Sequence, residues 1–127
     1  MITRLLYIAG GGAVGSVSRF LLGAFVQRLY GGDDFPLGTL SVNVLGCFII
    51  GFLGELFQSR VAVSSGWRFA LLVGFLGGFT TFSSFGYETV VLLREARALT
   101  ALGNVALQLL CGLTAVGIGM ATVRWLS

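Results

Sequence analysis

The residues best able to do chemistry lie between positions 74 and 86. This stretch reads GFLGGFTTFSSFG, with two adjacent glycines, two pairs of hydroxyl residues and three phenylalanines spaced three apart. Glycine costs about 1 kcal/mol relative to alanine inside a helix, and Ser and Thr side chains compete for backbone hydrogen bonds. We therefore expect a break in the helix here, which would free backbone N–H and carbonyl groups to bind an ion.

The polar groups within the apolar parts of the chain favour an anion over a cation. They are mainly hydroxyls, the amide of Asn43 and the guanidinium of Arg19, whereas the carboxylates lie at or near the ends of the apolar segments. A cation pathway is expected to contain a deeply placed acid. Phe82 and Phe85 would share one helical face, where the positive edges of their rings could hold a small dehydrated anion. The two rings could instead be packing contacts, and Asn43 could instead bond another helix.

Four long apolar segments must position these residues. The chain has 127 residues, of which 56% are hydrophobic and 10% are charged, and its mean hydropathy is +0.95. Soluble domains have nearer a quarter charged residues, so the bilayer is the expected solvent. Each segment has the roughly 20 residues that a helix needs to cross about 30 Å of hydrocarbon. The segments run from about 5 to 29, 35 to 54, 69 to 87 and 98 to 123.

The connections between these segments are short, and none can fold as a separate domain. The sequence therefore predicts an all-α membrane protein with a single transmembrane domain over residues 1–127. It is expected to have four transmembrane helices, the third of them broken. Non-helical backbone at membrane depth is tolerated only where protein or a water-filled cavity surrounds it, so the break predicts a binding site.

Charge and composition exclude several other classes of function. The net charge of +3 comes with arginines spread singly along the chain, unlike a nucleic-acid interface, and the composition is unlike that of a cytosolic enzyme. The chain has no histidine, and Cys47 and Cys111 lie in separate apolar runs, so zinc, haem and thiol-redox sites are not expected. Both thiols are expected to be buried. Gly10, Gly12 and Gly15 spell a dinucleotide-binding fingerprint, but the chain has no room for the parallel sheet that it needs.

The arginines show almost no preference for one side of the membrane. Orientation normally follows an excess of Lys and Arg on the cytoplasmic side, so insertion in both orientations is expected. Such a population favours an antiparallel homodimer, and one weakly preferred orientation is the alternative. Four helices place one group of arginines on one side and a second group opposite. The groups are Arg4, Arg60, Arg68 and Arg124 on one side, and Arg28, Arg94 and Arg97 on the other.

Glycine usage predicts close contacts between helices. The chain has 20 glycines, roughly twice the average usage. Gly11 and Gly15 are four residues apart, as are Gly74 and Gly78, and this small-xxx-small spacing lets helix backbones approach closely.

Taken together, these features resemble the Fluc (CrcB) family of fluoride channels. The resemblance rests on the G-x-L-G-G-x-T-T-F-S-x-F motif at 74–85, the GTLSVN run at 38–43 and Arg19, and it covers the whole chain. It implies a passive, fluoride-selective anion channel of the bacterial inner membrane that exports fluoride from the cytoplasm. It also implies a dual-topology antiparallel homodimer with two pores, and no enzyme activity.

The resemblance also implies roles for individual residues. Asn43 would donate its amide to the pore anion, and Phe82 and Phe85 would be the edge-on rings. Gly77 and Thr80 would offer backbone carbonyls to a structural sodium ion at the dimer interface. The remaining roles are pore hydroxyls at Ser83 and Ser84, a vestibule or intersubunit contact at Arg19, and a contact at the pore exit at Glu88.

The fourth segment departs from the family pattern. Family members often have a Ser and a Thr one turn apart here, where this chain has Gly112 and Val116. Gln108 and Thr114 are the nearest polar substitutes, and the sequence does not decide which residue of this segment lines the pore. Asn104 lies one turn before Gln108, so the two could shape a pore mouth or bridge helices.

Two other functions are possible for a short four-helix chain. A proton-coupled exporter of organic cations, like the small multidrug resistance transporters, needs a membrane-embedded carboxylate, but the first segment has Arg19 and no acid. An assembly subunit without transport activity would show no ion flux, and replacement of Phe82 or Phe85 would leave it unchanged.

Overall fold

Four helical spans form the structure, a computed structural model that describes residues 1–59 and 61–127. No strand occurs in these two ranges. Each span is long and apolar enough to cross a membrane, which confirms the predicted all-helical architecture. The spans are Ile2–Gly31, Leu37–Ser59, Ser65–Arg94 and Ala98–Trp125.

The first and third spans contain more than one helical element. The first is α1 (Ile2–Val26), continued by the wider π turn η1 (Gln27–Gly31). The second and fourth are single helices, α2 (Leu37–Ser59) and α6 (Ala98–Trp125). The third consists of α3 (Ser65–Arg68), the π-helical η2 (Phe69–Phe75), α4 (Leu76–Phe79) and α5 (Phe82–Arg94).

Local chemistry explains where two of the spans begin and end. The first span ends at Gly31, and the next residue, Gly32, has a φ of 52°, a left-handed conformation that glycine adopts without strain. Pro36 comes directly before α2, where a residue without a backbone N–H is tolerated because that group would have no helical acceptor. Ala96, with a φ of 58°, makes the tight connection between α5 and α6.

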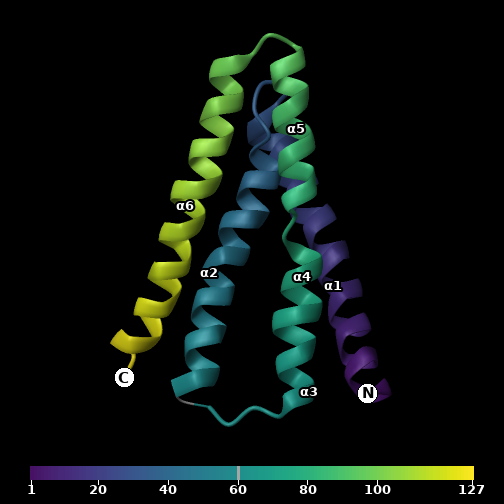
Figure 1. The fold of residues 1–127 in the computed structure, drawn as a ribbon, viewed down its shortest axis with the longest axis vertical. Coiled ribbons are helices and arrows are strands. Elements are labelled where there is room, and N and C mark those ends of the chain that lie inside the picture. The colour runs from purple at the N-terminus through teal and green to yellow at the C-terminus, as the bar shows by residue number, and fades with distance from the viewer. Residues whose placement is uncertain (60) are drawn as a thin grey trace.

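Both chain termini lie at one end of the molecule, and the connections from α1 to α2 and from α5 to α6 lie at the other (Figure 1). This arrangement agrees with the alternation of four spans used to assign the arginines to two sides. Arg60, one of the arginines in that assignment, lies outside the described residues.

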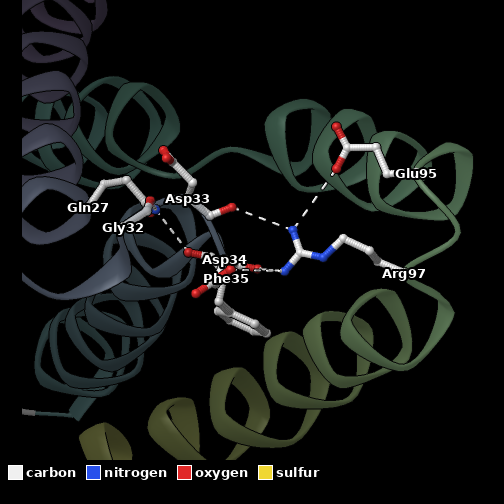
Figure 2. Close-up of polar contacts among 7 residues, drawn as sticks. All are labelled: Gln27, Gly32, Asp33, Asp34, Phe35, Glu95 and Arg97. Atoms are coloured by element: carbon white, nitrogen blue, oxygen red, sulfur yellow. Dashed lines mark hydrogen bonds and ion pairs between the residues drawn. The ribbon is translucent and has the colours of Figure 1, made fainter.

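The two connections at the end opposite the termini bind each other through Arg97 (Figure 2). Its Nη1 donates to the carbonyl of Asp33 at 3.5 Å and its Nη2 donates to the carbonyl of Asp34. Its guanidinium also lies 3.8 Å from Asp34 Oδ1 and 4.0 Å from Glu95 Oε2. Gln27 Nε2 closes the first connection by donating to the carbonyls of Gly32 at 2.7 Å and Phe35 at 2.9 Å. These contacts hold the ends of α2, α5 and α6 in one arrangement.

The glycines of α1 bring its backbone against the third span. A Cβ added at Gly11 would lie 2.1 Å from the Ala70 carbonyl oxygen, and one added at Gly15 would lie 2.1 Å from the Phe75 carbonyl oxygen. On the opposing side, a Cβ at Gly78 would lie 2.6 Å from the Gly12 carbonyl oxygen. Nothing larger than hydrogen fits at these positions, which confirms the predicted close contact between helix backbones.

Candidate functional site

The third span contains a short extended segment between α4 and α5, visible as a narrow link in Figure 1. Thr80 has φ −93° and ψ 159°, and Thr81 has φ −150° and ψ 114°. The Thr81 hydroxyl accepts a hydrogen bond from the Ser84 N–H at 3.1 Å, so Thr81 is the N-cap of α5. The first N–H groups of α5 and the positive end of its dipole therefore lie at this junction.

The side chain of Asn43, on α2, pairs with the extended backbone of Thr81. Asn43 Oδ1 accepts from the Thr81 N–H at 2.8 Å, and Asn43 Nδ2 donates to the Thr81 carbonyl at 2.9 Å. Asn43 Nδ2 also donates to Oε1 of Gln108, on α6, at 3.1 Å. Of the two roles considered for Asn43, bonding to another helix is thus present. Both of its amide hydrogens are donated to protein oxygens in this arrangement.

Two backbone carbonyls at the junction lose the partners that a continuous helix would give them. The Thr81 N–H donates to Asn43 rather than to the Gly77 carbonyl, and the Ser84 N–H donates to the Thr81 hydroxyl rather than to the Thr80 carbonyl. Gly77 is exposed, and nothing lies within 4 Å of the position of an added Cβ. Released carbonyl oxygens of this kind suit Na⁺, so the residues present fit the sodium ion that the family resemblance implies.

A cavity of about 400 Å³ lies beside the junction, and we call it the inner cavity. Phe82 and Phe85 line it with ring centroids 5.5 Å apart and ring planes at 61°, an edge-to-face arrangement. The Phe82 side chain is 82% exposed. The inner cavity brings together most of the predicted site residues. Those that line it are Asn43, Gly77, Thr80, Phe82, Phe85 and Gln108.

A second cavity of about 640 Å³, which we call the outer cavity, extends from the junction to the end opposite the termini. Arg19, Ser84 and Glu88 line it, and Thr39 on α2 donates to Glu88 Oε1 at 2.6 Å. Arg19 makes no ion pair with any carboxylate in the described part of the chain. Thr81 lines both cavities, so the junction separates them.

The hydroxyl residues after the junction divide between two environments. Ser84 Oγ accepts from Thr81 Oγ1 at 3.0 Å and lies on the outer cavity. Ser83 is exposed and lines neither cavity, although its Oγ is 3.4 Å from Thr81 Oγ1. Thr81 itself received no role from the sequence. The sequence feature that could have identified it is the Thr-x-x-Ser spacing. This spacing is typical of an N-cap residue whose hydroxyl accepts a hydrogen bond from the N–H three residues later.

On α6, the structure separates the residues that the sequence could not rank. Gln108 lines the inner cavity, Thr114 is exposed, and the Cβ position of Gly112 lies 3.4 Å from Cys47 Sγ. Asn104 is 0% exposed and donates to Thr89 Oγ1 of α5 at 3.1 Å, so it bridges helices. Cys47 and Cys111 are half-buried rather than buried, because the spans face outward over much of their surface.

Comparisons with known proteins agree on one family. The family model described as CrcB-like protein, Camphor Resistance (CrcB), matches residues 6–120. Three similar proteins are each named fluoride-specific ion channel FluC. The protein of Opitutus terrae is 50% identical, over 90% of this chain and 87% of its own length. The protein of Solibacter usitatus is 46% identical, over 95% of this chain and 98% of its own length. That of Rhizobium johnstonii is 42% identical over the full length of both chains.

Proposed function

The chain belongs to the CrcB-like family, and from this premise we propose that it is a multi-pass membrane channel selective for fluoride. It would act in the bacterial inner membrane and let fluoride leave the cytoplasm passively. The observation that supports this function best is the inner cavity at the junction, which two phenylalanine rings and polar side chains line beside the start of α5.

Selectivity follows from how the junction replaces water around the ion. A small anion holds its water tightly, so a pore must offer preorganised positive groups and still release the ion. The ring edges of Phe82 and Phe85 and the N-terminus of α5 would present such groups without a full charge. The residues that line the inner cavity include no carboxylate and no arginine. Weak, partial charges of this kind bind an anion without trapping it.

The outer cavity would serve as the vestibule. Arg19 lines it and makes no ion pair within the described residues, so Arg19 would be the group there that attracts anions. Four carboxylate residues line the same cavity and oppose this attraction: Asp33, Asp34, Glu88 and Glu95. From there, an anion would pass the hydroxyls of Thr81 and Ser84 to reach the inner cavity. Ser83, whose Oγ lies 3.4 Å from Thr81 Oγ1, would be a further hydroxyl at the junction.

A second copy of the chain in the opposite orientation would complete the assembly. Phe82 is 82% exposed and Gly77 is open on one side, although both line the inner cavity. The near-equal distribution of arginines also supports insertion in both orientations. An antiparallel dimer of this kind has two equivalent pores. The freed carbonyl oxygens of Gly77 and Thr80 would hold Na⁺ between the two copies, where the ion would supply a fixed positive charge.

A proton-coupled cation exporter is the weaker alternative. Such an exporter needs a carboxylate that exchanges a proton for the substrate, and none lines the inner cavity. Glu88, on α5, lies on the outer cavity and accepts a hydrogen bond from Thr39.

Ion efflux from liposomes tests the proposed function. Purified protein is reconstituted into liposomes loaded with fluoride or with chloride, and efflux is followed with ion-selective electrodes after the membrane potential is clamped. We expect rapid efflux of fluoride and little of chloride. Equal rates for both anions would contradict the proposed selectivity, and no efflux of either anion would contradict the proposed channel function.

A further inference from the structure

We propose that Gln108 supplies the amide donor that holds the anion in the inner cavity, and that Asn43 determines which end of Gln108 is free to do so. This inference rests on the proposed function and adds a selectivity residue on α6. Gln108 lines the inner cavity together with Phe82 and Phe85. Its Nε2 is buried, and no acceptor for it exists among the residues that the structure describes.

The orientation of both amide groups follows from the backbone of Thr81. A backbone N–H can only donate and a carbonyl can only accept, so Asn43 must turn Oδ1 toward the Thr81 N–H and Nδ2 toward its carbonyl. The second hydrogen of Asn43 Nδ2 then requires an acceptor, which is Oε1 of Gln108 at 3.1 Å. Gln108 therefore has its oxygen toward Asn43 and its Nε2 at the free end. The extended backbone of Thr81 thus determines, through Asn43, which end of the Gln108 amide is free.

The sign of the free group selects the sign of the ion. A buried N–H without an acceptor is costly, and an anion can satisfy it whereas a cation cannot. Besides Gln108 Nε2, two buried side-chain atoms lack a partner within the described residues. Both are acceptors, Glu88 Oε2 and Asn104 Oδ1. Neither Glu88 nor Asn104 lines the inner cavity. The unpartnered donor therefore belongs to a residue that lines the inner cavity.

This role also accounts for the departure of α6 from the family pattern. Gly112 is packed against Cys47, and Thr114 is exposed, so neither offers a donor to the inner cavity. The longer side chain of Gln108, on the same helix, is linked to the junction by the hydrogen bond that it accepts from Asn43.

Two substitutions at Gln108 separate the donor role from a supporting role. Gln108→Glu keeps the size of the side chain and an oxygen for Asn43, but it replaces Nε2 with a second oxygen. Gln108→Met keeps the length and removes both polar atoms without adding charge. If Nε2 binds the anion, both variants lose fluoride efflux by about tenfold or more, the scale of a lost hydrogen bond to a charged group. If Gln108 only accepts from Asn43, Gln108→Glu conducts like the unmodified protein.

Fluoride and chloride efflux are measured for each variant after its elution volume and thermal transition in detergent are compared with those of the unmodified protein. Thr114→Val, an exposed change six residues further along α6, is the matched control and should conduct normally. Normal fluoride efflux by either Gln108 variant overturns the inference and leaves the proposed function standing. Absence of fluoride efflux from the unmodified protein overturns the proposed function itself, so the two failures are distinct.

Discussion

The side-chain amide of Asn43 forms two reciprocal hydrogen bonds, of 2.8 and 2.9 Å, with the backbone of Thr81, much as a neighbouring strand would. These bonds satisfy a stretch of backbone that has left the helix, which matters because an unpaired backbone group costs several kcal/mol in hydrocarbon. The same pairing withholds the Thr81 N–H from the Gly77 carbonyl. A single side chain thus both stabilises the junction and frees a carbonyl oxygen.

Asn43→Leu should therefore cost stability as well as conduction. The change removes both bonds to Thr81 and the bond to Gln108, so we expect a loss of about 2–4 kcal/mol of unfolding free energy and no fluoride efflux. Thermal unfolding in detergent and efflux from liposomes measure the two effects. Asn104→Leu is the control, because this buried amide bonds Thr89 and lines neither cavity. It should lower stability yet keep conduction, and normal efflux by Asn43→Leu would contradict the prediction.

Local chemistry made much of this arrangement predictable. Runs without charge gave the four spans, and the small-xxx-small pairs gave the contact of α1 with the third span. The π turns η1 and η2 had no such signal, since they depend on how the neighbouring spans pack. The side-chain partners were also out of reach. Asn43 contacts Thr81 and Gln108 only because α2, α5 and α6 each present a particular face to the others. The rotation of each helix about its own axis depends on packing, which a single sequence does not specify.

The edges of the two phenylalanine rings should be needed for conduction rather than for folding. Phe82→Ile and Phe85→Ile keep an apolar side chain but remove the ring edge that would face the anion. We expect each to reduce fluoride efflux by about tenfold. Phe25→Ile, an exposed change on α1 that lines neither cavity, should leave efflux unchanged. Reduced efflux in all three variants would indicate a general loss of packing instead.

The charge of Arg19 should act over a distance, which makes its effect depend on salt. In Arg19→Gln, fluoride efflux should fall several-fold at about 0.01 M ionic strength and much less at about 1 M, where the Debye length is roughly 3 Å. Efflux is measured across a series of concentrations of an impermeant background salt. Arg28→Gln removes an exposed arginine that lines neither cavity and should show no such dependence. An effect of Arg19→Gln that is equal at all salt concentrations would argue for a structural contact.

Two glycines on α1 should respond in opposite ways to the same substitution. A Cβ at Gly15 would lie 2.1 Å from the Phe75 carbonyl oxygen, so Gly15→Ala must push α1 away from η2. We expect a loss of about 1–3 kcal/mol, the cost of overpacking a close contact. Nothing lies within 4 Å of the Cβ position at Gly10, so Gly10→Ala should be neutral or stabilise α1 by up to about 1 kcal/mol. Thermal unfolding in detergent compares the pair, and equal midpoints would show that α1 does not contact the third span through Gly15.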